Sequence, residues 1–121
     1  MRWKNKKDFQ AYCKRRSERM SRLGQELEKQ VEEILLRMWE ERLICAFAHN
    51  PANSLEDSQG KDFSVTQETG GEETVRHFGV TISMRSWQKA KGKHEDVPQF
   101  HFPIGTNRKT IEKRILELFQ P

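Results

Sequence analysis

The sequence predicts an α+β fold in which a mainly antiparallel or mixed four-stranded sheet is flanked by a long N-terminal helix and a C-terminal helix, in the order αββββα. Three observations predict it. Apolar residues recur at steps of three or four between positions 20 and 38, as on one face of a helix. Two stretches, 62–68 and 74–86, alternate between apolar and polar residues on either side of a Gly-Gly pair. The chain then closes on a second helical pattern at 111–119.

The N-terminal helix is expected in two parts. A basic helix covers roughly residues 6–20 and a main amphipathic helix roughly residues 22–42. Gly24 lowers the stability of a helix by about 1 kcal/mol relative to alanine, so the sequence predicts either a bend near it or one continuous helix. We therefore divide the chain into a basic helical extension, residues 1–21, and an α+β domain, residues 22–121.

Short apolar or alternating runs place the strands. The first is expected at 43–49 and the second at 62–68. Gly70 and Gly71 then make a hairpin turn into a return strand at 74–86. One face of the return strand is apolar and comprises Phe78, Val80, Ile82 and Met84. Its other face is polar and comprises His77, Gly79, Thr81, Ser83 and Arg85.

The last third of the chain is expected to hold a basic loop, a short strand and a helix. The loop covers residues 87–93 and the strand residues 98–104. Thr106 or Asn107 can cap the final helix. The apolar face of that helix comprises Ile111, Ile115, Leu118 and Phe119.

Composition narrows the class of protein. Charged residues make up 33% of the 121 residues and apolar residues 34%, so much of the chain faces solvent or a partner. No apolar run reaches the roughly 18 residues that a transmembrane helix needs, and the basic N-terminus lacks the apolar region of a signal peptide. Cys13 and Cys45 lie on separate elements without metal-binding spacing. We therefore expect a cytoplasmic protein with reduced cysteines and no membrane partner.

Positive charge is concentrated at the N-terminus. Residues 1–22 hold nine basic and two acidic residues, whereas the remainder holds 13 basic and 16 acidic ones. A basic segment of this kind attracts polyphosphate or an anionic membrane surface. Lys14, Arg15 and Arg16 are therefore candidate nucleic-acid-binding residues. The alternative is a solvated, positively charged helix face.

Three short stretches carry a family resemblance. The first is a helical stretch with an internal glutamate, Glu28, within GQELEKQV at 24–31. The second leads through a glycine into a strand and bears Asp62, within DSQGKDFSV at 57–65. The third belongs to the return strand and reads FGVTIS at 78–83. In their order and spacing these stretches resemble the restriction-endonuclease-like, or PD-(D/E)XK, superfamily.

The resemblance implies a nuclease-like fold for the α+β domain and a divalent-metal site with Glu28 and Asp62 as ligands. Mg²⁺ is the only cofactor that it implies. The family pattern continues with an acid and a lysine on the return strand, where this sequence has Ser83 and Arg85 instead. Because a guanidinium stays protonated near neutral pH, Arg85 can replace the charge of the lysine but not act as a base. The candidate catalytic residues are thus Glu28, Asp62, Ser83 and Arg85.

Both carboxylates also have interpretations without a metal. Asp62 can be a turn or bulge residue whose side chain satisfies nearby backbone amides, and Glu28 can lie on the surface or in an ion pair. The family, moreover, usually places a helix between its third and fourth strands, where residues 87–97 predict a loop.

Two further groups of cations are candidate nucleic-acid-binding residues. The basic loop surrounds an aromatic side chain that can stack on bases with cations that can pair with phosphates, and comprises Arg85, Trp87, Lys89, Lys91 and Lys93. Arg108 and Lys109 begin the final helix, where main-chain amides can bind phosphate. The alternatives are a charged loop with Trp87 packed in the core and an ordinary helix start.

The sequence therefore predicts a protein that binds DNA or RNA on a restriction-endonuclease-like frame and is catalytically weak or inactive. One alternative is an active Mg²⁺-dependent nuclease that uses Glu28 and Asp62. Another is a protein-interaction module or homodimer built on the apolar face of the N-terminal helix. That face comprises Met20, Leu23, Leu27, Val31, Ile34 and Met38.

Overall fold

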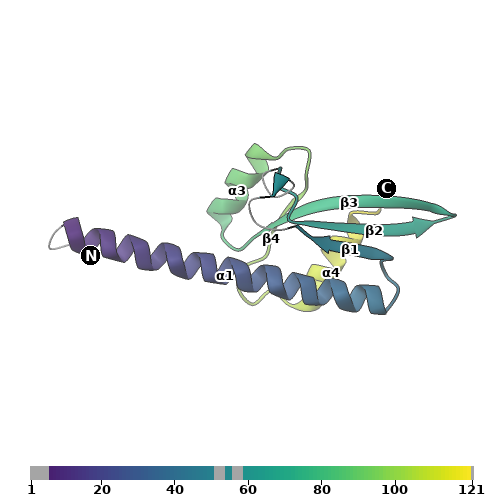
Figure 1. Cartoon of the computed structure of the whole chain (residues 1–121), viewed down its shortest axis with the longest axis horizontal. Coiled ribbons are helices and arrows are strands. Elements are labelled where there is room, and N and C mark those ends of the chain that lie inside the picture. Colours follow the sequence, from purple (N-terminus) through teal and green to yellow (C-terminus); the bar gives the residue numbers. More distant parts are fainter. Residues whose placement is uncertain (1–5, 51–53, 56–58, 121) are drawn as a thin grey trace.

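The computed structural model describes residues 6–50, 54–55 and 59–120 (Figure 1). Its helices and strands are α1 (Lys6–Glu40), β1 (Ala46–His49), β2 (Phe63–Thr69), β3 (Glu72–Thr81), α3 (Met84–Lys93), β4 (Gln99–His101) and α4 (Arg108–Glu117). The predicted α+β class is confirmed. The start of the DSQGKDFSV stretch and the first five residues of the basic extension lie outside the described residues.

The sheet is mixed, with the strand order β1-β2-β3-β4. β1 pairs with β2, and β2 with β3, in antiparallel fashion, while β3 and β4 are parallel. A parallel pair needs a crossover that returns the chain to the same end of the sheet. α3 forms this crossover and lies on the opposite side of the sheet from α1 and α4 (Figure 1).

The prediction of a loop at 87–93 is wrong, because this segment belongs to α3. Ser83 begins the helix, since its Oγ accepts a hydrogen bond from the Ser86 N–H at 3.1 Å. The sequence favours a loop here because the segment is short and rich in Gly and charge. In the structure α3 has no buried residue. The expected return strand at 74–86 is correspondingly too long, and Met84, at 51% exposure, does not share the apolar face of β3.

The predicted hairpin is confirmed. β2 and β3 meet at Gly70 and Gly71, whose φ angles of 61° and 84° favour glycine and fit a tight two-residue turn. Alternation along β2 buries Phe63 and Val65. Phe78 lies opposite Phe63, and the two rings stack with centroids 5.4 Å apart.

α1 is one continuous helix, with no break at Gly24. In its C-terminal half the apolar stripe packs against the sheet and α4, and the buried core comprises Leu27, Val31, Ile34, Leu35, Met38, Phe63, Val65, Phe78, Ile111 and Ile115, among others. Asn107 caps α4, because its Oδ1 accepts a hydrogen bond from the Thr110 N–H at 2.8 Å. None of the helices in the described part of the chain is long and apolar enough to cross a membrane.

The N-terminal half of α1 projects beyond the sheet (Figure 1). Every side chain from Lys6 to Arg22 that the structure describes is exposed. This projecting segment, residues 6–22, is roughly 25 Å long from the rise per residue of an α-helix. It corresponds to most of the basic extension that the sequence predicts.

Candidate functional site

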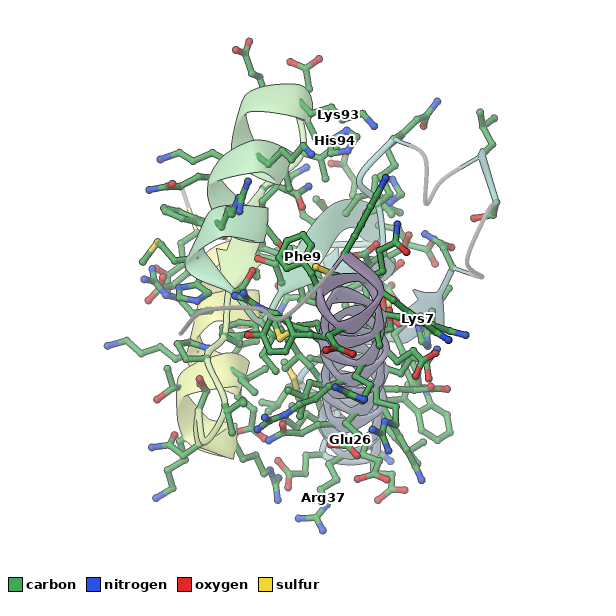
Figure 2. All side chains as sticks on the ribbon, turned by 90° about the vertical axis from the view of Figure 1, so that its left-hand side faces the viewer. Lys7, Phe9, Glu26, Arg37, Lys93 and His94 are labelled. Atoms are coloured by element: carbon green, nitrogen blue, oxygen red, sulfur yellow. The ribbon has the colours of Figure 1, made fainter. Side chains whose placement is uncertain are left out.

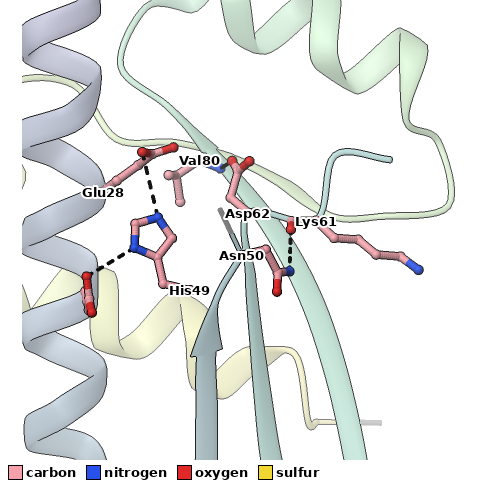
Figure 3. Close-up of polar contacts among 7 residues, drawn as sticks. Glu28, His49, Asn50, Lys61, Asp62 and Val80 are labelled. Carbon is pink, nitrogen blue, oxygen red and sulfur yellow. Dashed lines mark hydrogen bonds and ion pairs between the residues drawn. The ribbon is translucent and has the colours of Figure 1, made fainter. Parts of the chain in front are cut away.

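Asp62 lies where β2 and β3 separate. The register pairs Phe63 with Phe78, and pairing of the two strands ends there although β3 continues to Thr81. The next amide of β3 that points towards β2 belongs to Val80. Its N–H donates a hydrogen bond to Asp62 Oδ2 at 2.9 Å. The side chain of Asp62 therefore takes the place of a main-chain acceptor in the ladder, and holds the end of β2 against β3 (Figure 3).

Asn50, which follows β1, holds the main chain of Lys61 and Asp62 in place through two hydrogen bonds. The Asn50 N–H donates to the Asp62 carbonyl at 2.9 Å, and Asn50 Nδ2 donates to the Lys61 carbonyl at 2.6 Å. The end of β1 thus satisfies two main-chain acceptors of the segment that leads into β2. Asp62 is half-buried, so its carboxylate is held in place yet remains partly accessible to solvent.

Glu28 reaches the same end of the sheet through His49. Its Oε2 lies 3.8 Å from His49 Nε2, while His49 Nδ1 lies 3.1 Å from Glu32 Oε2. The His49 ring stacks on Phe63, the residue after Asp62, with centroids 4.4 Å apart. Figure 3 shows the Glu28 and Asp62 carboxylates at this end of the sheet, with His49 beneath Glu28.

His49 is absent from the sequence-based candidates. It stands at the end of a short strand with no motif around it, and Glu28 and Glu32 lie on a different element. Glu28 and Glu32 lie one helical turn apart, so the sequence indicates that they share one side of the helix and can contact the same residue. It does not indicate that this residue is His49.

Glu28 and Asp62 alone fit a metal ion poorly. Mg²⁺ binds through oxygen ligands and can keep several waters beside one or two carboxylates. Within the described ranges, however, no three His, Cys, Asp or Glu side chains are grouped so that they could hold a metal ion. One oxygen of Asp62 also accepts from Val80. Among the described residues, the candidate donor set is therefore Glu28 and Asp62, and one of these two carboxylates already accepts a hydrogen bond.

Ser83 and Arg85 lie beyond the end of β3. Ser83 caps α3, and Arg85 is exposed in its first turn. One step beyond the last pair of the β2–β3 register, Asp62 would face Gly79. A Cβ atom at Gly79 would lie 2.1 Å from Gln99 Oε1 and 2.7 Å from the Gly60 carbonyl oxygen. The position on β3 nearest to Asp62 therefore has no room for an acidic side chain.

The cations of α3 divide into two groups. Arg85, Lys89 and Lys93 follow one another at intervals of four residues, so they share one side of the helix, and all three are exposed. Lys91 points elsewhere, with its Nζ 4.7 Å from the centre of the Trp87 ring. The α3 row, Arg85, Lys89 and Lys93, is the longest line of cations on this helix.

Trp87 anchors α3 to the sheet. Its Nε1 donates to the Gln99 carbonyl at 2.7 Å, and its ring stacks with His101 at 6.1 Å between centroids. With Lys91 above its ring, the half-buried Trp87 is a packing residue and offers little surface to a nucleobase. The interpretation in which Trp87 packs inward is the one that these contacts favour.

The α3 row ends beside the segment that leads into Asp62. Lys93 and His94 line a groove with Gln59 and Lys61, and Figure 2 shows Lys93 and His94 together at the end of α3. Gly60 packs so closely under the His94 ring that a Cβ atom there would lie 2.5 Å from it. One end of the cation row thus lies beside the residues that precede Asp62, in a groove that Glu95 and Asp96 also line.

The other predicted cations are not gathered here. Arg108 donates to Glu112 at 2.9 Å and to Glu41 at 3.4 Å, so it ties the start of α4 to the end of α1. Lys109 is exposed on α4. The three remaining candidates are exposed on the projecting segment of α1, namely Lys14, Arg15 and Arg16.

Comparison with protein-family models, curated proteins and solved structures finds no match to this chain. Its function is therefore argued from the contacts, charges and topology described above.

Proposed function

We propose that this protein binds nucleic acid on a restriction-endonuclease-like frame and has little or no nuclease activity. The observation that carries the proposal is the α3 row, Arg85, Lys89 and Lys93, which is exposed over its whole length and ends beside the residues that precede Asp62. Lysine and arginine side chains pair with phosphates and release counterions, and this supplies most of the affinity in sequence-independent binding.

The topology supports the frame. The family usually has a helix between its third and fourth strands, and here α3 connects β3 to β4. The helix glutamate and strand aspartate expected of the family correspond to Glu28 on α1 and Asp62 before β2, at one end of the sheet (Figure 3).

The residues on and after β3 support the proposal that catalysis is weak or absent. Hydrolysis of a phosphodiester requires an oriented water and stabilisation of developing charge. Ser83 stands where the family has its acid, but it lies beyond β3 and caps α3. Arg85, a permanent cation outside the strand, cannot serve as a base. Asp62 is engaged in holding β3. A binding platform requires none of the missing groups.

Fluorescence anisotropy with labelled single-stranded DNA, duplex DNA and RNA tests the proposal. Binding should weaken steeply between about 50 and 200 mM salt. The triple variant R85A/K89A/K93A should weaken binding to all sequences alike, and should reduce the slope of log K against log salt on duplex DNA by up to about 3. DNA and RNA are both candidate ligands, and the titrations rank them.

A matched control separates the α3 row from net charge. K29A/R37A/K113A removes three exposed cations from α1 and α4. If this variant loses as much affinity as the α3 variant, binding is diffuse and the proposed surface is wrong. Absence of binding to all three ligands at low salt would exclude nucleic acid as the partner.

A further inference from the structure

The apolar stripe of α1 continues into the projecting segment, beyond the reach of the sheet. Leu27, Val31 and Ile34 are buried in the core. On the same side of the helix, Phe9 is 46% exposed and Met20 is 38% exposed. The continuation of the stripe comprises Phe9, Tyr12, Cys13 and Met20. Exposed apolar side chains in a row, next to polar ones, mark an interaction surface more often than single exposed residues do.

The stripe faces a concave corner of the molecule. Figure 2 shows Phe9 on the side of α1 towards α3, while Lys7 points away from it. At the inner end of the stripe, Leu23 lines a cleft with Ile82 and Ile104. Ile104 is 70% exposed, so the floor of this corner is apolar where the helix leaves the domain. The corner is therefore bounded by the projecting segment on one side and by the end of the sheet on the other.

The rim of the corner is cationic. The projecting segment, residues 6–22, carries seven basic and two acidic residues. Arg16 lies within the stripe between Cys13 and Met20, Arg19 lies beside the stripe, and both are exposed. An occupant that complements both features must be apolar along a narrow line and carry carboxylates where it meets Arg16 and Arg19.

A second copy of this chain does not meet that requirement. Two stripes packed together would bring two strongly basic segments into contact, which is unfavourable.

A flat anionic bilayer and a nucleic acid also fit less well. The end of the sheet and α3 stand on the side to which the stripe points, so a plane cannot follow it down to Leu23 (Figures 1 and 2). Nucleic acid would neutralise the arginines, but it offers only π-faces to Met20 and Ile104. A helix with one apolar side can follow the stripe from Phe9 to Leu23.

We propose that the projecting segment docks an acidic amphipathic helix of a partner protein. The partner helix lays its apolar side chains along the stripe from Phe9 to Leu23, and its end contacts Ile104. Its carboxylates pair with Arg16, which interrupts the stripe, and with Arg19 beside it. Helix-in-groove recognition of this kind depends on anchors one turn apart on the incoming helix. This docking does not depend on the nucleic-acid binding proposed for α3.

The probe is a labelled synthetic peptide of about 18 residues, long enough to match the segment, with leucines at i, i+3, i+4 and i+7 and glutamates beside them. A scrambled peptide of the same composition has the charge without the apolar row. Anisotropy titrations should show saturable, salt-sensitive binding of the patterned peptide and at least about tenfold weaker binding of the scrambled one.

The decisive variant is F9S/M20S, compared with L36S/W39S. Leu36 and Trp39 are 44% and 49% exposed at the other end of α1, so both variants remove two exposed apolar side chains from one helix. F9S/M20S should weaken peptide binding by about tenfold or more and L36S/W39S by less than twofold. Circular dichroism should show the same helix content in both variants.

Equal loss in both variants, equal binding of the two peptides, or no binding of the patterned peptide would overturn the proposal. So would two results that assign the stripe elsewhere: dimerisation in sedimentation velocity that F9S/M20S abolishes, or binding to single-stranded DNA or phosphatidylserine vesicles that this variant alone abolishes. Retention of nucleic-acid binding by F9S/M20S, with loss of peptide binding, separates this docking from the function proposed for α3.

Discussion

The carboxylate of Asp62 accepts a hydrogen bond from the main-chain amide of Val80 at 2.9 Å, at the point where β2 leaves β3. This relationship connects two of the alternatives that the sequence leaves open. Asp62 satisfies a backbone amide, as a turn or bulge residue does, and it stands where the resemblance places a metal ligand. Variants of Asp62 must therefore distinguish its structural role, which needs a hydrogen-bond acceptor, from a chemical role, which needs the negative charge.

Asp62→Ala should destabilise the fold, because it leaves the Val80 amide without its acceptor. The expected loss is about 1–3 kcal/mol in the free energy of unfolding. Asp62→Asn keeps an amide oxygen in the same place and should cost about 1 kcal/mol or less. Urea denaturation measures both values, with Glu68→Ala as the control because Glu68 is an exposed carboxylate on the same strand. Equal stability of the alanine and asparagine variants would show that the hydrogen bond contributes nothing.

Gly79→Ala should destabilise the protein by about 1–3 kcal/mol, since the added methyl group meets both the Gln99 side chain and the Gly60 carbonyl. Gln99 can move, but Gly60 is main chain. Gly24→Ala is the matched control, because no atom lies within 4 Å of its added Cβ and α1 is helical there. That variant should stabilise by about 0.5–1 kcal/mol. Thermal unfolding curves that shift the two proteins in the same direction would contradict this prediction.

Trp87→Phe should lower stability and leave nucleic-acid affinity nearly unchanged. The phenylalanine keeps an aromatic ring but loses the N–H that donates to the Gln99 carbonyl, at an expected cost of about 1–2 kcal/mol. Denaturation and anisotropy titrations on the same preparation measure the two effects. A drop in affinity of about fivefold or more, with stability unchanged, would instead make Trp87 a stacking platform.

The parts of the fold that the sequence predicts correctly are those with a local period. The stripe on α1 and the alternation of β2 and β3 repeat at the spacing of their own element, and the Gly70-Gly71 turn is short-range. α3 is short and rich in charge, none of its residues is buried, and it is held by the Ser83 cap and by Trp87. Its existence follows from the parallel pairing of β3 with β4, which no local pattern reveals.

The residues of the candidate site also fall into two groups, those that the sequence identifies and those that only the structure reveals. Glu28 and Asp62 were identified through the resemblance, and both lie at one end of the sheet. The contacts of His49 with Glu28 and of Gln99 with Gly60 join residues far apart in the chain. Such contacts depend on tertiary packing, so they cannot be predicted from the periodicity of a single sequence.

Incubation with Mg²⁺ or Mn²⁺ should produce little or no cleavage of single-stranded DNA, duplex DNA or RNA. Two carboxylates without a third ligand among the described residues hold an ion loosely, and β3 supplies neither the acid nor the lysine that would place an attacking water. The assay should include Asp62→Asn and Glu28→Gln, which remove the charges while keeping oxygen acceptors for Val80 and His49. All three proteins should bind nucleic acid with similar affinity, because removing a negative charge beside the phosphates does not weaken their pairing with the α3 row. Cleavage by the parent that disappears in both variants, with their stability intact, would establish a working metal-dependent nuclease and refute the binding platform proposed here.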